Sequence, residues 1–324
     1  MRDNVGVPSR LVNAVDFRLS ESLPRPAYLF VRRRYYDVRK LAGQNPGRGR
    51  ILPDFLVIGA AKSGTTTLYG SLIEHPFVKP CTTSDPYFAK TKEVHFFDYN
   101  FYRGEDWYRS HFPLARERQE FAREHGRPFL TGEGSPSYIS HLWAPQRVRR
   151  MLPNVKLIAV FRNPVDRAFS QFQMSRREGL EEFESFEEAI RHEGERLTPE
   201  LERMAADPRN NSRVFGTFSY LARSRYAEQV ERWLGLFPRE RFLFLKAEDL
   251  FVEPERVLGT VHEFLELPPD RKAQPPRLNT AEYDSLARET RLELTEYFRP
   301  HNERLYELVG TDFGWERDPA GVAV

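Results

Sequence analysis

The stretch Phe55–Leu68, with the sequence FLVIGAAKSGTTTL, indicates how this chain folds and where it binds a ligand. An apolar run ends at Gly59, a loop carries Lys62, and hydroxyl residues open an amphipathic run. This order predicts a buried strand, a phosphate-binding loop and the N-terminus of a helix. Backbone N–H groups, the helix dipole and the lysine would together attract an anion such as phosphate.

The loop differs from the Walker A motif of nucleotide triphosphatases, GxxxxGK[ST]. Gly59 and Gly64 have the Walker spacing, but Thr65 stands where that motif has its lysine. The lysine lies inside the loop, at Lys62, so it should face a different atom of the nucleotide. An ordinary strand–turn–helix connection with a surface lysine is the weaker alternative, because glycine spacing, lysine and threonines coincide after a good strand.

In the form GxxKSGTTxL, the loop resembles the 5′-phosphosulfate loop of sulfotransferases, which use 3′-phosphoadenosine 5′-phosphosulfate (PAPS). Three later segments resemble the glycosaminoglycan branch of that family: Lys92–Asp98 (KEVHFFD), Val160–Ser170 (VFRNPVDRAFS) and the region from Glu296 to Trp315. The four matches follow in the family's order, so the chain resembles a soluble, bacterial-type PAPS-dependent sulfotransferase.

The resemblance implies a nucleotide site with two parts. Arg162 and Ser170 would clamp the 3′-phosphate, because an arginine fork suits phosphate oxygens. An ion pair between Arg162 and Asp166 is the alternative for this arginine. Lys62 would also stabilise the charge that grows on the leaving oxygen during transfer. The 5′-phosphate would bind to the loop residues Lys62, Ser63, Gly64, Thr65, Thr66 and Thr67.

The segment Lys92–Asp98 would act on the acceptor. In the glycosaminoglycan branch its glutamate is the general base, which corresponds to Glu93, and the resemblance places Lys92, His95 and Asp98 beside the acceptor. In sulfotransferases that act on phenols and steroids the base is a histidine, so His95 remains the alternative base. An ordinary surface ion pair between Lys92 and Glu93 is the non-catalytic alternative.

Two departures from the glycosaminoglycan branch affect the expected acceptor. The segment Glu133–Tyr138 (EGSPSY) has Gly134 where the animal enzymes have a lysine that faces the acceptor. Their Lys-Gly-Arg motif is missing, and the nearest candidate, around Arg277, matches poorly. We therefore expect transfer to a hydroxyl or amine of a carbohydrate or glycosylated molecule. A non-carbohydrate small molecule, with His95 as base, is the alternative.

Composition fits one α/β domain with a substantial core. The chain has 324 residues, of which 40% are hydrophobic, and its net charge of +2 gives no reason to expect a nucleic-acid partner. Residues 1–50 hold eleven Arg and Lys against four Asp and Glu. We interpret them as a solvated extension and linker and do not favour membrane binding through them. The sulfotransferase domain would span 51–318, followed by a tail over 319–324.

Other features point to a reducing compartment. Cys81 is the single cysteine, so no internal disulfide can form, and no metal-ligand spacing surrounds it. The first 22 residues lack a signal-peptide core, and no apolar run approaches the roughly 20 residues of a transmembrane helix. We expect a cytoplasmic enzyme that needs no metal. The sequence leaves its oligomeric state open.

Periodicity predicts a P-loop-like parallel β-sheet flanked by helices, as in the sulfotransferase fold. Strands are expected at 55–59, 129–133, 155–161 and 242–245, and helices at 65–74, from Pro164 onward, across 181–202 as exposed helices, at 224–237, and at 291–308 with an interruption at Pro300. A P-loop kinase or NTPase, with Glu248 or Asp249 in a weak Walker B position, and a non-catalytic binding module are the competing function classes.

Overall fold

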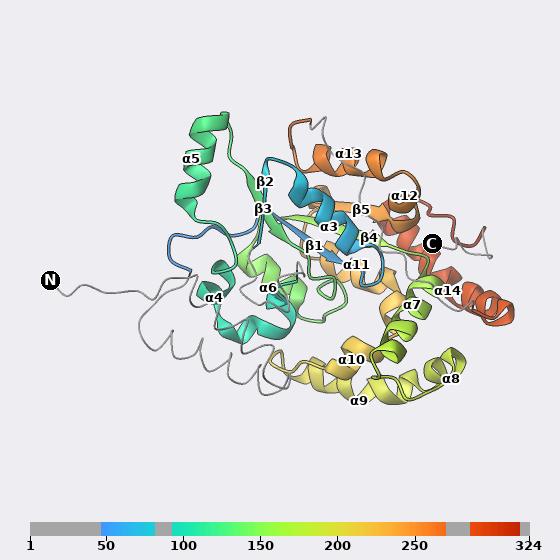
Figure 1. The fold of residues 1–324 in the computed structure, drawn as a ribbon. Coiled ribbons are helices and arrows are strands. Elements are labelled where there is room, and N and C mark those ends of the chain that lie inside the picture. The colour runs from blue at the N-terminus through green and yellow to red at the C-terminus, as the bar shows by residue number, and fades with distance from the viewer. Residues whose placement is uncertain (1–46, 82–92, 270–285, 318–324) are drawn as a thin grey trace.

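The computed structural model describes residues 47–81, 93–269 and 286–317. Its centre is one sheet of five parallel strands in the order β2-β3-β1-β4-β5 (Figure 1). The predicted parallel α/β architecture is therefore confirmed. The strands are β1 (Phe55–Gly59), β2 (Val78–Pro80), β3 (Leu130–Glu133), β4 (Lys156–Phe161) and β5 (Phe242–Lys246).

The sequence did not predict β2. This strand has only three residues, and it ends in a proline, which cannot donate a hydrogen bond to a ladder. It lies at the edge of the sheet, where a proline is tolerated, and pairs with β3 alone.

The sheet is buried on both faces because alternate residues of each strand point to opposite sides. Phe55 and Val57 of β1 pack toward α3 (Thr65–Glu74) and α13 (Pro254–Phe264). Leu56 and Ile58 join the larger core on the other face. That core also holds residues of α6 (Ala144–Met151), α11 (Tyr226–Leu234) and α14 (Arg288–Val309).

A second group of helices forms a layer beside the sheet and gathers at the bottom of Figure 1. It comprises α8 (Phe186–Arg191), α9 (Glu193–Ala206) and α10 (Arg213–Phe218), and α7 (Pro164–Arg177) joins it to β4. The remaining elements are α4 (Glu105–Arg109), α5 (Ala115–His125), α12 (Ala247–Val252), the π-helix η1 (Phe96–Asn100) and the 3-10 turns η2 (Phe101–Arg103), η3 (Ala222–Ser224) and η4 (Arg239–Arg241).

Local patterns in the sequence predicted several helices and strands correctly. The strand over 55–59 and the helix over 65–74 have the predicted bounds. Asn163 caps α7 as expected, since its side chain accepts hydrogen bonds from the backbone N–H of Val165, at 3.0 Å, and of Asp166. Pro164 then occupies the first helical position, where its missing N–H costs nothing.

Two expectations about helices were wrong. Helix α14 runs through Pro300 without a break, because Phe298 and Leu305 on either side are fully buried and anchor the helix in two different cores. The charge-rich stretch 181–202 is not simply exposed. Glu181 is buried against Arg196 and Tyr220, and Glu193 is also buried. Among the described residues, no helix has the length and apolar character needed to cross a membrane.

The burial of β4 gives a prediction about stability. Leu157→Ala should lower the free energy of unfolding by about 2–5 kcal/mol, because it opens a cavity at a fully buried position of the core. Leu292→Ala is the matched control, since Leu292 is 45% exposed on α14 and should change stability by less than about 0.5 kcal/mol. Urea unfolding followed by circular dichroism measures both. Equal losses would contradict the burial of β4.

Candidate active site

The parallel sheet brings the predicted nucleotide residues to one edge. In such a sheet, ligands bind beyond the carboxyl ends of the strands, where the strand order changes direction. Here that point is β1, which pairs with β3 on one side and β4 on the other. The loop with Lys62 follows β1, Glu133 ends β3, and Arg162 follows β4.

The loop after β1 has the backbone of an anion-binding turn. Lys62 and Gly64 both have left-handed backbone conformations, with φ of 72° and 80°. A Cβ on Gly64 would lie 2.9 Å from the ring of Phe251, so this position excludes other residues on both grounds. Gly64 opens α3, whose first turn carries no acidic residue and no side-chain cap. The helix N-terminus is therefore suited to an anion.

The second part of the predicted nucleotide site lies across the same edge. Lys62 reaches toward α7, with its Nζ 3.4 Å from Sδ of Met174. Ser170, one turn earlier on that helix, is buried. Arg162 does not form the ion pair with Asp166 that was its alternative role, because Asp166 instead binds Arg291 at 2.7 Å.

This set of side chains fits a doubly phosphorylated nucleotide. Cations and hydrogen-bond donors follow both β1 and β4, and the first turn of α3 adds no competing carboxylate. Within the described ranges, no cluster of three or more His, Cys, Asp or Glu residues could hold a metal ion.

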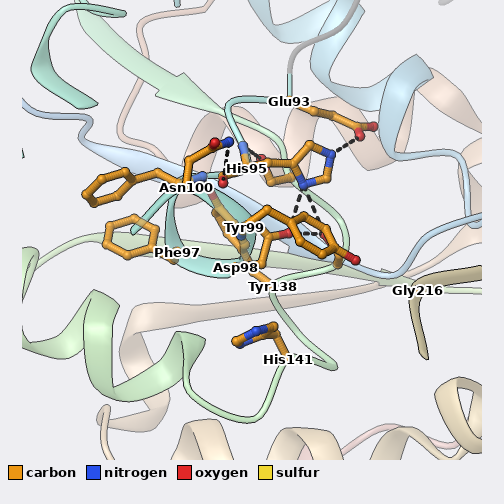
Figure 2. A network of polar contacts seen from close by, with 12 residues as sticks. Glu93, His95, Phe97, Asp98, Tyr99, Asn100, Tyr138, His141 and Gly216 are labelled. Carbon is orange, nitrogen blue, oxygen red and sulfur yellow. Dashed lines mark hydrogen bonds and ion pairs between the residues drawn. The ribbon is translucent and has the colours of Figure 1, made fainter. Parts of the chain in front are cut away.

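On the acceptor side, a polar network joins three residues of the segment 93–98 (Figure 2). The imidazole of His95 lies between two carboxylates: its Nε2 is 2.9 Å from Oε2 of Glu93, and its Nδ1 is 2.8 Å from Oδ2 of Asp98. Ser137 donates a hydrogen bond of 2.5 Å to the same oxygen of Asp98. Asp98 is fully buried, whereas the Glu93 side chain is 26% exposed and remains within reach of solvent. We call Glu93, His95 and Asp98 the carboxylate–histidine network.

The network holds His95 in its charged form. Burial alone would lower the pKa of His95, but the Asp98 charge and the hydrogen bonds to Asp98 and Glu93 raise the pKa to about 10. Burial also disfavours ionised Asp98, but the charge of His95 and the Ser137 hydroxyl hold the pKa of Asp98 below its usual value. At neutral pH an imidazolium therefore lies between the two carboxylates. Its stabilising contribution is complete below the ordinary histidine pKa and is lost as the pH rises toward 10.

The backbone around the network is unusual. His95 has a left-handed φ of 51° and precedes the π-helix η1, a helix type that is frequent at functional sites. Asn100 donates from its side chain to the carbonyl of His95 at 3.0 Å. Arg147 donates to the carbonyls of Phe97 and Asp98, at 2.5 and 3.1 Å.

A cavity of about 290 Å³ adjoins the network at Asp98. Its walls combine rings with cations: Phe101, Tyr102, Trp143, Arg147 and Arg150. Rings of this kind and a few convergent polar groups are typical of a small-molecule site.

Sequence reasoning missed several residues of this site. Ser137 and Tyr138 belong to the segment EGSPSY, which drew attention only for the lysine that Gly134 replaces. Arg147 had no sequence signal, because it reaches η1 only through the tertiary fold. Two predicted positions, Lys92 and Arg277, lie outside the described residues, so their roles stay predictions.

Comparisons with known proteins agree with this arrangement. A profile of the sulfotransferase domain matches residues 52–303. Human heparan sulfate glucosamine 3-O-sulfotransferase 6 is 32% identical over 296 residues, which cover 83% of this chain and 75% of that protein. Membrane-associated sulfotransferase kil1 of Dictyostelium discoideum is 28% identical over 339 residues, covering 84% of this chain and 68% of that protein. The crystal structure of a sulfotransferase from Alicyclobacillus acidocaldarius is similar over 82% of this chain and 99% of its own, with 28% identity and a TM-score of 0.62.

The chain therefore belongs to the sulfotransferase family, and its predicted place in the glycosaminoglycan branch is confirmed, among the heparan sulfate enzymes. It is an enzyme that transfers sulfuryl groups. Both Walker B candidates of the NTPase alternative have other partners. The carboxylate of Glu248 accepts hydrogen bonds from the backbone N–H of Asn163 and the indole of Trp315, and Asp249 forms an ion pair with Arg256.

The charge state of His95 is directly measurable. Two-dimensional NMR of the imidazole nitrogens should show His95 titrating near pH 10. Asp98→Asn should lower that pKa, because it removes the negative charge at Nδ1. Asp54→Asn is the control: Asp54 binds Arg118 and the backbone N–H of Thr131, away from the network. A wild-type His95 that titrates near 6.5 would contradict the geometry described here.

Proposed function

We propose that this enzyme transfers the sulfuryl group of PAPS to a hydroxyl or amine of a carbohydrate, with Glu93 as the general base. The single observation that carries the proposal is the carboxylate–histidine network beside the phosphate-binding edge of the sheet. The names of relatives support the acceptor class, since the human protein is described as acting on heparan sulfate glucosamine.

The nucleotide-binding half of the proposal rests on charge. PAPS supplies, when bound, an activated sulfuryl group on its 5′-phosphate. Lys62 and the N-terminus of α3 would hold that phosphate, and Arg162 with Ser170 would hold the 3′-phosphate. These cations stabilise growing negative charge more than the ground state, which is the condition for catalysis. With two cationic side chains in these positions, we propose that no metal ion is required.

The choice of Glu93 over His95 as base rests on protonation. A base must be able to accept a proton, and His95 already carries one below about pH 10. Glu93 lies 2.9 Å from that imidazolium and is partly open to solvent. When Glu93 accepts the proton of the acceptor, Asp98 still balances the charge of His95. His95 then orients the base and keeps its oxygen in place.

The cavity beside Asp98 supports a sugar-like acceptor. Its aromatic rings offer flat apolar surfaces, and the exposed Arg150 offers donors for hydroxyl or acidic groups. Gly134 leaves out the lysine found in the glycosaminoglycan branch, so we propose a smaller or less acidic glycan than heparan sulfate. The proposed cytoplasmic location follows only from the sequence.

The nucleotide site predicts binding without metal. Excess 3′-phosphoadenosine 5′-phosphate, with a chelator present, should raise the melting temperature, because ligand at 100 times its dissociation constant stabilises a fold by roughly 2.7 kcal/mol. Arg162→Ala should weaken this binding about tenfold or more, the loss expected for a charge-assisted hydrogen bond. Arg123→Ala, at an exposed position on α5, is the matched control for titration calorimetry. A thermal shift seen only with magnesium and ATP would refute the proposal.

The base assignment predicts how turnover depends on pH. Glu93→Gln keeps the shape of the side chain but should lower kcat by about 10²–10⁴-fold, with nucleotide affinity retained. Wild-type kcat should not climb between neutral pH and about 10 and should fall above it, because His95 orients Glu93 only while it carries its proton. If His95 were the base, kcat would climb about tenfold per pH unit until its pKa near 10.

An acceptor screen comes before these rate measurements. It uses radiolabelled PAPS with a panel of desulfated heparan, simple glycosides and phenols, and identifies the acceptor to be used. Transfer to phenols alone, with Glu93→Gln active and His95→Gln inactive, would overturn both the base and the acceptor class.

A further inference from the structure

We infer that the segment Glu133–Tyr138 positions the catalytic base by holding the backbone that directly follows it. This inference rests on the proposed role of Glu93. Three side chains of the segment, Glu133, Ser135 and Tyr138, bind three successive N–H groups of the strip Val94–Phe96. We call this arrangement the backbone clamp. Its members act through Glu93 and His95 and are positioning residues.

The clamp consists of three hydrogen bonds in register. Oε2 of Glu133 accepts from the N–H of Val94 at 3.3 Å, and the hydroxyl of Ser135 accepts from His95 at 3.0 Å. The hydroxyl of Tyr138 accepts from Phe96 at 2.8 Å. The three accepting residues are fully buried, so water does not compete for these N–H groups. A fourth contact, from Ser137 to Asp98, ties the same segment to the far end of the network.

Glu133 fixes the direction in which the hydroxyls of Ser135 and Tyr138 donate. Each hydroxyl has one hydrogen to donate, and both are directed at this carboxylate: Ser135 at 2.6 Å and Tyr138 at 2.7 Å. Their lone pairs are then left to accept from His95 and Phe96. Burial raises the pKa of Glu133 to about 7, although Ser135, Tyr138 and the other donors oppose this. Burying a carboxylate is unfavourable, as the raised pKa shows. We explain its presence here by the two hydroxyls that it orients.

The strip needs such a clamp because its conformation is unfavourable. His95 has a φ of 51°, in the left-handed region that non-glycine residues rarely adopt. In this conformation of the backbone its side chain meets Glu93 and Asp98 at once. Loss of one clamp bond would free the strip to relax, and a base displaced by even about 1 Å loses much of its effect.

Two buried tyrosines make a matched test. Tyr138 and Tyr108 both donate to Oε1 of Glu133, at 2.7 and 3.0 Å, and both are fully buried. Only Tyr138 also accepts from the strip, at Phe96. Tyr138→Phe and Tyr108→Phe therefore remove the same atom and the same bond to Glu133, and differ in the clamp bond alone.

The first measurement needs no acceptor and tests the clamp even if the proposed activity fails. NMR titration should show a lower pKa of His95 in Tyr138→Phe than in Tyr108→Phe, because the contacts to Glu93 and Asp98 loosen. The second is steady-state kinetics with the acceptor found for wild type. Tyr138→Phe should lose about 10- to 100-fold in kcat relative to Tyr108→Phe, with the affinity for 3′-phosphoadenosine 5′-phosphate unchanged.

Equal values of the His95 pKa and of kcat in the two variants would overturn the inference, since the effect would then pass through Glu133 alone. Should Tyr138→Phe fail to fold, Ser135→Ala makes the same comparison at the next clamp bond. Its control is Ser140→Ala, a buried serine whose hydroxyl donates to the carbonyl of Ser137 and does not contact the strip.

Discussion

The parallel pairing of β1 with β3 and β4 is the constraint on which the rest of the site depends. Because all three strands point the same way, their carboxyl ends meet at one edge, where the Lys62 loop, Glu133 and Arg162 lie. The segment with Glu93 and His95 is held at that edge by hydrogen bonds to Glu133, Ser135 and Ser137. An antiparallel neighbour would send the Lys62 loop and Arg162 to opposite edges. The burial of both sheet faces by helices leaves this edge as the place where polar chemistry can occur without disturbing the core.

At that edge, the ionisation of each buried carboxylate depends on the charge of its partners. Asp98 and Glu133 are both fully buried carboxylates, but their environments differ. Asp98 faces the charge of His95, which keeps it ionised, whereas Glu133 has only neutral donors and a raised pKa. The first fixes the protonation state of the network and the second fixes its backbone. Similar carboxylates thus serve two roles because only one has a cationic partner.

Much of the fold could be predicted because its signals are local. The strand before Gly59, the helix from Thr65 and the Asn163 cap depend on residues a few positions apart, and the structure has them as predicted. The continuation of α14 through Pro300 could not be predicted, because distant core contacts override the local cost of the proline. The burial of Glu181 likewise depends on partners far along the chain, Arg196 on α9 and Tyr220 after α10.

For the site, the sequence by itself determined the residue types and their order: the lysine inside the loop, the segment with Glu93 and His95, and the arginine after β4. Those patterns indicated the family, which the comparisons confirmed. Only the tertiary structure decided the protonation of His95 and the backbone clamp. The clamp joins residues about 40 positions apart. The partners of His95 are near it in sequence, but its charge state depends on its burial and on the backbone conformation that brings both carboxylates to its ring, which periodicity alone does not give.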